Sequence, residues 1–239
     1  MTVSAQQQTS QFALDVAEGL SLEGQKKLAP RYFYDDLGSS LFEAITLLPE
    51  YGLTRADERL IKRHSGQIAE LAAGVATVSE LGSGTGKKTS HIVRSLQSNG
   101  HRVTYRPIDV SSLALSSCEK ELGSFCQVAP VCADWLSGLD EISRQRTGHE
   151  PMLLLFLGSS IGNLDRLEIP DFLTELRFRL RPNDYLLLGA DLVKDRDTMI
   201  AAYDDPTGVT AAFNLNVLGR INRELSADFD LRSFGHEVR

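Results

Sequence analysis

Short apolar runs alternate with amphipathic stretches between about residues 60 and 195, and this alternation is what most constrains the fold. Two runs, MLLLFL (152–157) and YLLLGA (185–190), are apolar on both faces, which is typical of parallel strands covered by helices on both sides. Three earlier runs read as strands in the same way, at residues 76–81, 103–108 and 126–132. Helices are expected between the runs, from Lys88 to about Gln97, over residues 111–122 and over residues 167–180. The sequence therefore predicts an α/β fold with a parallel sheet.

The two ends of the chain do not continue this alternation. Residues 1–58 begin as a helix and then become rich in aromatic side chains, and residues 196–239 are helical in pattern to about Leu225. We therefore expect residues 59–195 to form the sheet domain. Residues 1–58 and 196–239 are expected to form together a second, small and mostly helical lobe, packed over the edge of the sheet that binds ligands.

Charge and composition argue against several classes of protein. A formal net charge of −7 disfavours a nucleic-acid partner, because phosphate binding needs a basic surface. No apolar run approaches the roughly 20 residues that span a bilayer, and the first residues lack the pattern of a signal peptide. A cytoplasmic protein without a membrane partner is expected. The three cysteines form no Cys-x-x-Cys pair and the histidines are scattered, so we expect reduced thiols and no metal site.

The stretch SELGSGTGKKTS (79–90) follows the first apolar run and is rich in glycine. An ATP-binding loop needs four residues between its first glycine and the Gly-Lys pair, and only three separate Gly82 from Gly86. The dinucleotide pattern GxGxxG also fails, because the third glycine comes one position early. The pattern that fits is acid-x-Gly-x-Gly-x-Gly, which starts at Glu80. It resembles the first motif of the class I S-adenosylmethionine (SAM)-dependent methyltransferases, although a plain tight turn stays open as the alternative.

That resemblance implies a Rossmann-like sheet and SAM as cofactor, with S-adenosylhomocysteine (SAH) as its product. The loop lies where open α/β sheets bind ligands, at the carboxyl end of a strand. Glycines let the backbone approach the ligand closely, and the helix that follows directs its free N–H groups at the carboxylate of the ligand. Lys88 adds a positive charge for the same carboxylate. The cofactor-binding candidates in this loop are Glu80, Gly82, Gly84, Gly86 and Lys88.

Two later acids follow the next strands in the order that this class uses. Asp109 comes after the second run, where a carboxylate accepts both ribose hydroxyls. Asp134 follows the third run, where the class recognises the adenine amino group, and Trp135 beside it offers a stacking surface. Taken alone, Asp109 is equally well explained as a cap of the helix that follows it.

The fourth run leads into LGSSIGNL (157–164), where Asn163 ends a Gly-Ser-rich loop. Asn163 is a substrate-binding candidate, with capping of a helix near Asp165 as the alternative. Five blocks spanning residues 32–230 resemble the histidine-specific α-N-methyltransferases of ergothioneine biosynthesis: YFYDDLGSSLFEAITLLPEYGLTRAD, ELGSGTGKKT, FLGSSIGNL, GADLVKD and AYDDPTGVTAAFNLNVLGRINRELSADFD.

This second resemblance implies an enzyme that converts L-histidine to its trimethylated betaine, hercynine, by three successive transfers from SAM. It implies that the small lobe of residues 1–58 and 196–239 recognises the substrate. It also assigns the amino acid's amino and carboxylate groups to Tyr34, Tyr51, Asn163 and Tyr203. The reaction is an in-line displacement at a sulfonium methyl, so the protein mainly positions a neutral amine, and Tyr34 and Asn163 are the candidates for positioning it. No residue stands out as an acid or base catalyst. Each tyrosine is equally well explained as a half-buried packing residue.

Members of this family continue beyond the point that corresponds to Arg239, so the chain is expected to lack their C-terminal part. A sheet edge would then be left open, and a homo-oligomer is one way to complete it. Three interpretations stay open: a fragment of a longer enzyme, a short homologue that methylates another small amine, and a module that binds SAM without catalysis.

Overall fold

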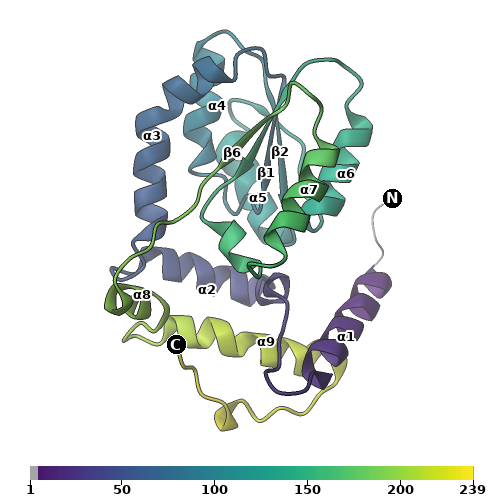
Figure 1. The fold of residues 1–239 in the computed structure, drawn as a ribbon, viewed down its shortest axis with the longest axis vertical. Coiled ribbons are helices and arrows are strands. Elements are labelled where there is room, and N and C mark those ends of the chain that lie inside the picture. The colour runs from purple at the N-terminus through teal and green to yellow at the C-terminus, as the bar shows by residue number, and fades with distance from the viewer. Residues whose placement is uncertain (1–4, 239) are drawn as a thin grey trace. The chain divides into compact units, whose positions relative to one another are not determined.

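A computed structural model describes residues 5–238 (Figure 1). The chain divides into two compact units: Gly52–Val193, here called the sheet unit, and Met1–Tyr51 with Lys194–Arg239, here called the terminal unit. The sheet unit therefore begins at Gly52, whereas the sequence analysis expected it to begin at residue 59. The reason is helix α3 (Leu53–Leu71), which packs against α4 (Thr89–Ser98) in the sheet unit.

The sheet unit is built on a parallel sheet with the strand order β3-β2-β1-β5-β6, and β4 also pairs with β2. Its strands are β1 (Thr77–Leu81), β2 (Thr104–Asp109), β3 (Gln127–Val128), β4 (Val131–Cys132), β5 (Met152–Phe156) and β6 (Tyr185–Leu188). The predicted α/β fold is confirmed. The run 126–132 forms two short strands instead of one, because Pro130 between them has no N–H to donate to the ladder. Since all pairs are parallel, the carboxyl ends of the strands lie along one edge.

Helices cover both faces of this sheet, as Figure 1 shows for α3 and α4 on one side and for α6 (Trp135–Gln145) and α7 (Ile169–Arg179) on the other. Every residue of β5 is buried, and its side chains alternate between the two faces. Leu153 and Leu155 join the core under α3, α4 and α5 (Ser112–Leu122). Met152, Leu154 and Phe156 join the core under α6 and α7. Helices α3 and α6 were not among those expected from the sequence.

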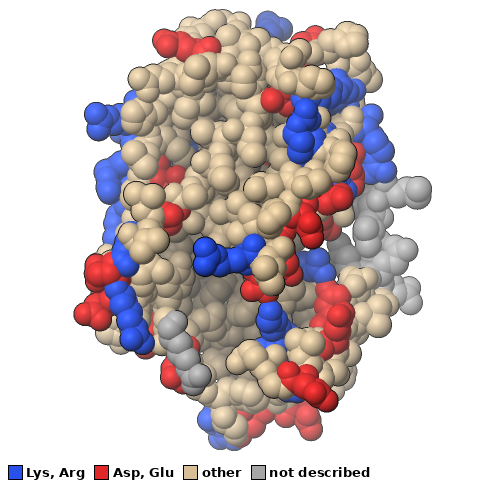
Figure 2. Space-filling view, viewed as in Figure 1, with Lys and Arg blue, Asp and Glu red and all other residues tan. Residues whose placement is uncertain are grey.

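Strand β6 differs from β5 in burial. Tyr185, Leu186 and Leu188 are 41%, 39% and 40% exposed, and among the residues described β6 pairs with β5 alone. In Figure 2 the surface over β6 carries almost no Lys, Arg, Asp or Glu. The expectation that helices cover this strand on both sides is therefore wrong for the described chain.

The terminal unit is made of helices. Its elements are α1 (Ala5–Ser21), η1 (Pro30–Phe33), α2 (Asp36–Leu47), α8 (Arg196–Tyr203), α9 (Val209–Leu225) and η3 (Leu231–Ser233). Helices α2 and α9 pack together, and Phe12, Tyr32, Val217 and Ile221 form its core. The unit therefore joins the two ends of the chain. Within residues 5–238, no helix is both long and apolar enough to cross a membrane.

Candidate functional site

The loop after β1 is shaped by Gly82, Gly84 and Gly86, which all have positive φ angles, of 68°, 53° and 70°. A side chain at such a backbone conformation is strained, so glycine is favoured at each position. The surroundings of the glycines differ. A Cβ on Gly84 would meet no protein atom within 4 Å, whereas a Cβ on Gly86 would lie 2.4 Å from Cys118 Sγ. Gly84 thus leaves open space beside the backbone, and Gly86 lets α5 pack closely against the loop.

Glu80 lies beneath this loop and is only 3% exposed. Its Oε2 accepts hydrogen bonds from Thr89 Oγ1 at 2.6 Å and from the Tyr105 hydroxyl at 2.5 Å. Burial raises the pKa of Glu80 to about 7, although these two hydrogen bonds act in the opposite direction. The observed contacts make Glu80 a support that connects β1, β2 and the start of α4. A direct contact with a ligand stays a prediction.

Asp109 ends β2 beside the same loop. Its Oδ2 accepts from the N–H of Gly84 at 3.0 Å, and its Oδ1 accepts from the N–H of Ser111 at 2.9 Å. Burial raises the pKa of Asp109 above its usual value, against the effect of these backbone donors. The cap of α5 is Ser111, whose hydroxyl accepts from the N–H of Ala114, so the capping alternative for Asp109 is wrong. The Asp109 carboxylate instead fixes the turn at Gly84.

Asp134 and Trp135 follow β4 and begin α6. The Asp134 side chain caps this helix, accepting from the N–H of Ser137 at 3.0 Å. The Trp135 ring lies 4.8 Å from the ring of Phe156, centroid to centroid, and its Nε1 lies 3.3 Å from the place of a Cβ on Gly82. Trp135 thus connects the core under α6 to the glycine-rich loop.

The loop after β5 has an unusual backbone. Gly158 has a φ of 70°, and Ser159, which is not a glycine, has a φ of 58°. Such strain in a non-glycine residue is often found at functional sites. The loop continues into η2 (Ser160–Asn163), and the Asn163 side chain is exposed. Helix α7 begins only at Ile169, so the alternative that Asn163 caps a helix is wrong.

Lys88 forms an ion pair with Asp57, a residue that the sequence analysis did not single out. Its Nζ donates to Asp57 Oδ2 at 2.5 Å, and the two side chains are 23% and 13% exposed. Asp57 lies on α3, 31 residues earlier in the chain. The only signal in the sequence is a pair of acids, Asp57-Glu58, that complements the pair Lys87-Lys88. Spacing alone does not connect the two pairs.

Three of the four predicted substrate residues lie in one aromatic cluster of the terminal unit. The rings of Tyr34 and Phe42 are 5.5 Å apart, Phe42 and Tyr51 are 6.3 Å apart, and Tyr51 and Tyr203 are 6.0 Å apart. The Tyr51–Tyr203 pair meets edge to face, at 88°. Tyr51 is buried, whereas Tyr203 is 43% exposed. The fourth residue, Asn163, belongs to the sheet unit.

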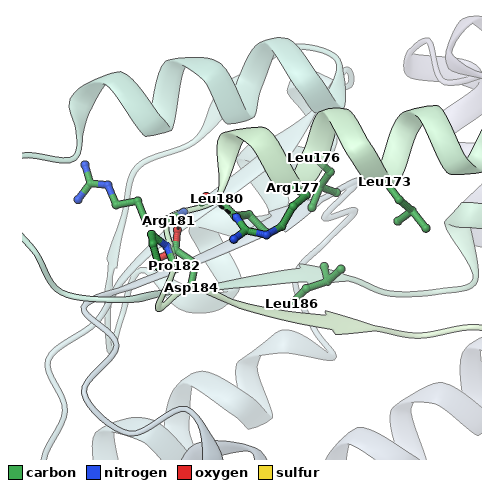
Figure 3. A pocket seen from close by; sticks show the side chains of 8 residues that line it. All are labelled: Leu173, Leu176, Arg177, Leu180, Arg181, Pro182, Asp184 and Leu186. Carbon is green, nitrogen blue, oxygen red and sulfur yellow. Dashed lines mark hydrogen bonds between the residues drawn. The ribbon is translucent and has the colours of Figure 1, made fainter.

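A pocket of about 360 Å³ lies elsewhere in the sheet unit, between α7 and β6 (Figure 3). Leu173 and Leu176 of α7 and Leu186 of β6 line it together with Leu180, and none of the predicted site residues does. Asp184, also in its lining, forms a buried ion pair with Arg146 at 2.6 Å. This pocket is apolar and separate from the glycine-rich loop. Among residues 5–238, no group of three or more His, Cys, Asp and Glu side chains is arranged to hold a metal ion.

Comparison with known proteins connects this geometry to a family. The family described as histidine-specific methyltransferase, SAM-dependent, matches residues 12–239. The histidine N-alpha-methyltransferase of Mycobacterium tuberculosis is 44% identical over 228 residues, and that of Mycolicibacterium smegmatis is 43% identical. Each alignment covers 94% of this chain and 69% of the relative. Ergothioneine biosynthesis protein 1 of Neurospora crassa is 31% identical over 84% of this chain and 23% of its own length.

Proposed function

Since the chain belongs to the SAM-dependent, histidine-specific methyltransferases, we propose that it methylates the α-amino nitrogen of L-histidine. Three successive transfers give hercynine, the trimethylated betaine, as a step of ergothioneine biosynthesis. The observation that carries this proposal is the extent of the family match. Residues 12–239 include the glycine-rich loop of the sheet unit and the aromatic cluster of the terminal unit.

The residues at the carboxyl edge of the sheet fit SAM. Gly84 leaves open space beside its backbone, and the two backbone N–H groups that bind Asp109 fix a carboxylate next to that space. We assign Asp109 to the ribose hydroxyls, Trp135 to the adenine ring and Lys88 to the methionyl carboxylate. When bound, SAM supplies a methyl group on a positively charged sulfur.

The acceptor nitrogen must be neutral before it can attack that methyl group. An α-ammonium is mostly protonated at neutral pH, so polar neighbours that accept its proton favour the neutral amine. In the terminal unit, we assign Tyr34, Tyr51 and Tyr203 to the amino acid, because aromatic rings stabilise the cation that develops on the nitrogen. From the sheet unit, we assign Asn163, whose exposed amide offers both a donor and an acceptor. Positioning accounts for the catalysis in this assignment.

Mass spectrometry of histidine after incubation with the protein and SAM tests the proposal. Gains of one, two and three methyl groups are expected, with one SAH formed for each methyl group transferred. Asn163→Ala should weaken histidine turnover and leave SAH affinity unchanged, because Asn163 makes no cap. If histidine gains no methyl group while SAH binds, histidine is not the acceptor, and a panel of other amines is the next assay.

We also propose that the unpaired edge of β6 supports a homo-oligomer. Its exposed apolar side chains and the nearly uncharged surface over it support this assignment (Figure 2). A cytoplasmic location is proposed as well, since Cys118, Cys126 and Cys132 are all free thiols, as in proteins of reducing compartments.

A further inference from the structure

Asp57 of α3 joins two loops that follow neighbouring strands. Its Oδ2 accepts a hydrogen bond from Lys88 Nζ at 2.5 Å and another from the N–H of Gly158 at 3.1 Å. Lys88 ends the loop after β1, and Gly158 begins the loop after β5, which is the partner of β1 in the sheet. One carboxylate oxygen therefore holds together the carboxyl-edge loops of two adjacent strands.

A second acid–lysine pair, Glu58–Lys87, is adjacent in sequence to the first, and the two pairs can be compared in length and exposure. Glu58 Oε1 and Lys87 Nζ are 3.7 Å apart, and their side chains are 32% and 67% exposed. The Asp57–Lys88 pair is shorter and far less exposed, at 13% and 23%. Water and salt screen the outer pair, whereas the inner pair is partly withdrawn from solvent and its geometry is restricted. The two pairs thus have the same chemistry in different surroundings.

We propose that Asp57 is a positioning residue for the cofactor: it holds the Lys88 ammonium at the carboxyl edge, where that group binds the methionyl carboxylate. Asp57 therefore strengthens binding only of ligands that carry this carboxylate. The inference rests on the assignment of Lys88 within the proposed function, and it is independent of which amine accepts the methyl group.

Two effects of Asp57 oppose each other. Its negative charge repels an incoming carboxylate, which weakens the attraction of Lys88. Against this, a lysine side chain has many rotamers, and binding through an unrestrained lysine must first restrict them. The ammonium has three N–H donors, so one bond to Asp57 leaves two for the ligand. Because the methionyl group also carries an ammonium, its net charge is zero and the repulsion is partly offset. Positioning is therefore expected to dominate.

Calorimetric titration with two ligands separates positioning from general damage. SAH carries the same amino acid carboxylate on its homocysteine part, whereas 5′-methylthioadenosine keeps the nucleoside and the sulfur but lacks the amino acid part. Asp57→Asn keeps an oxygen that can accept from the Gly158 N–H while removing the charge that holds Lys88. It should weaken SAH by about tenfold, the usual effect of a hydrogen bond to a charged group. Binding of 5′-methylthioadenosine should change by less than about twofold, within the usual effect of a distant surface change.

Two further variants complete the design. Glu58→Gln removes the outer acid and should leave both affinities unchanged. Lys88→Met should reproduce the selective loss of SAH affinity, and adding Asp57→Asn to it should cause no further loss, because the two residues act through one interaction. Thermal unfolding of each variant confirms that it is folded before its affinities are compared.

Three results would overturn the inference. Equal loss of both ligands upon Asp57→Asn would mean that Asp57 only stabilises the loops. Unchanged SAH binding would mean that the two effects of Asp57 cancel, and tighter binding would mean that Asp57 competes with the ligand for Lys88. Additive losses in the double variant would mean that Asp57 acts without Lys88. Failure to methylate histidine would contradict the proposed function. It would not affect this test, because the affinities for SAH and 5′-methylthioadenosine are measured without a methyl acceptor.

Discussion

Glu80 is a buried carboxyl whose ionisation costs the folded protein free energy. Its pKa is about 7 in the folded protein, raised by burial above the usual 4.5. The folded state thus retains a proton that the unfolded state releases. The stability that the folded protein gains by keeping Glu80 protonated is fully present below pH 4.5 and is lost as the pH rises through 7. The loss amounts to about 3 kcal/mol, from 1.36 kcal/mol per pKa unit.

Glu80→Gln should remove this dependence, because the amide keeps an oxygen that accepts from Thr89 and Tyr105. The difference in free energy of unfolding between variant and parent should shift by about 2.5 kcal/mol in favour of the variant between pH 5 and 8, since part of the loss has already occurred at pH 5. Denaturant titrations at both pH values measure it, and other titrating groups cancel in the difference. Burial raises the pKa of Tyr105 and that of Cys118, to about 12 for the latter, so neither contributes in this range. A constant difference would mean that Glu80 ionises normally.

Gly84 and Gly86 share a positive φ but differ in surroundings, so substitution by alanine should separate two effects. Gly84→Ala adds a methyl group to open space and should cost about 1 kcal/mol of stability, from backbone strain. It should also weaken SAH, because the methyl group enters the space that we assign to the ligand. Gly86→Ala adds contacts with Cys118 and Leu122, at 2.4 and 2.8 Å, and should cost a further 1–3 kcal/mol, roughly. Denaturation and calorimetry together measure both; if Gly84→Ala binds SAH normally, the ligand lies elsewhere.

At the scale of elements, Asp35 connects α2 to α9. Its Oδ1 accepts from the N–H of Gly38 at 2.8 Å, which caps α2, and from Asn216 Nδ2 of α9 at 2.7 Å. Arg223 of α9 donates to Oδ2 at 2.6 Å. Burial alone would raise the pKa of Asp35, but these donors outweigh it and lower the pKa below its usual 3.8. The stability that Asp35 gives is therefore present above pH 3.8 and lost as the pH falls through the lower, folded-state value.

Asp35→Ala should lower the free energy of unfolding by about 2–3 kcal/mol near neutral pH, because it removes a cap and leaves the buried Asn216 amide without this acceptor. The neighbouring exposed Asp36 is the matched control, and Asp36→Ala should cost less than about 0.5 kcal/mol. Denaturant unfolding followed by circular dichroism measures both. Equal effects of the two variants would contradict the view that Asp35 joins the helices.

The helices and strands of the sheet unit could be predicted from the sequence more reliably than the packing around them. MLLLFL and YLLLGA have nearly the same apolar pattern, yet every residue of β5 is buried while Leu188 of β6 is 40% exposed. An apolar pattern indicates that a strand can be buried, but it does not identify the elements that cover the strand. The loop from Glu80 to Lys88 could be predicted because its pattern is local. Asp57 could not, since its partners Lys88 and Gly158 are distant in sequence and only the packing of α3 brings them together.

For the whole molecule, the outer edge of β6, which no other strand among residues 5–238 pairs with, is expected to affect behaviour in solution. A strand edge with exposed N–H and C=O groups and apolar side chains tends to pair with another chain. We expect the 239-residue chain to associate as its concentration rises, measured by sedimentation velocity. Leu188→Lys should weaken this association, because a charge on the edge opposes pairing.

The matched control is Leu60→Lys on α3, where an equally apolar residue is 59% exposed but belongs to no strand edge. If association requires the β6 edge, Leu60→Lys leaves it unchanged while Leu188→Lys reduces it. Equal effects of the two lysines would mean that association depends on net charge, since each adds one positive charge to a chain of net charge −7. A parent protein that stays monomeric at all concentrations would instead show that β6 is protected without a partner, and the proposed homo-oligomer would be wrong.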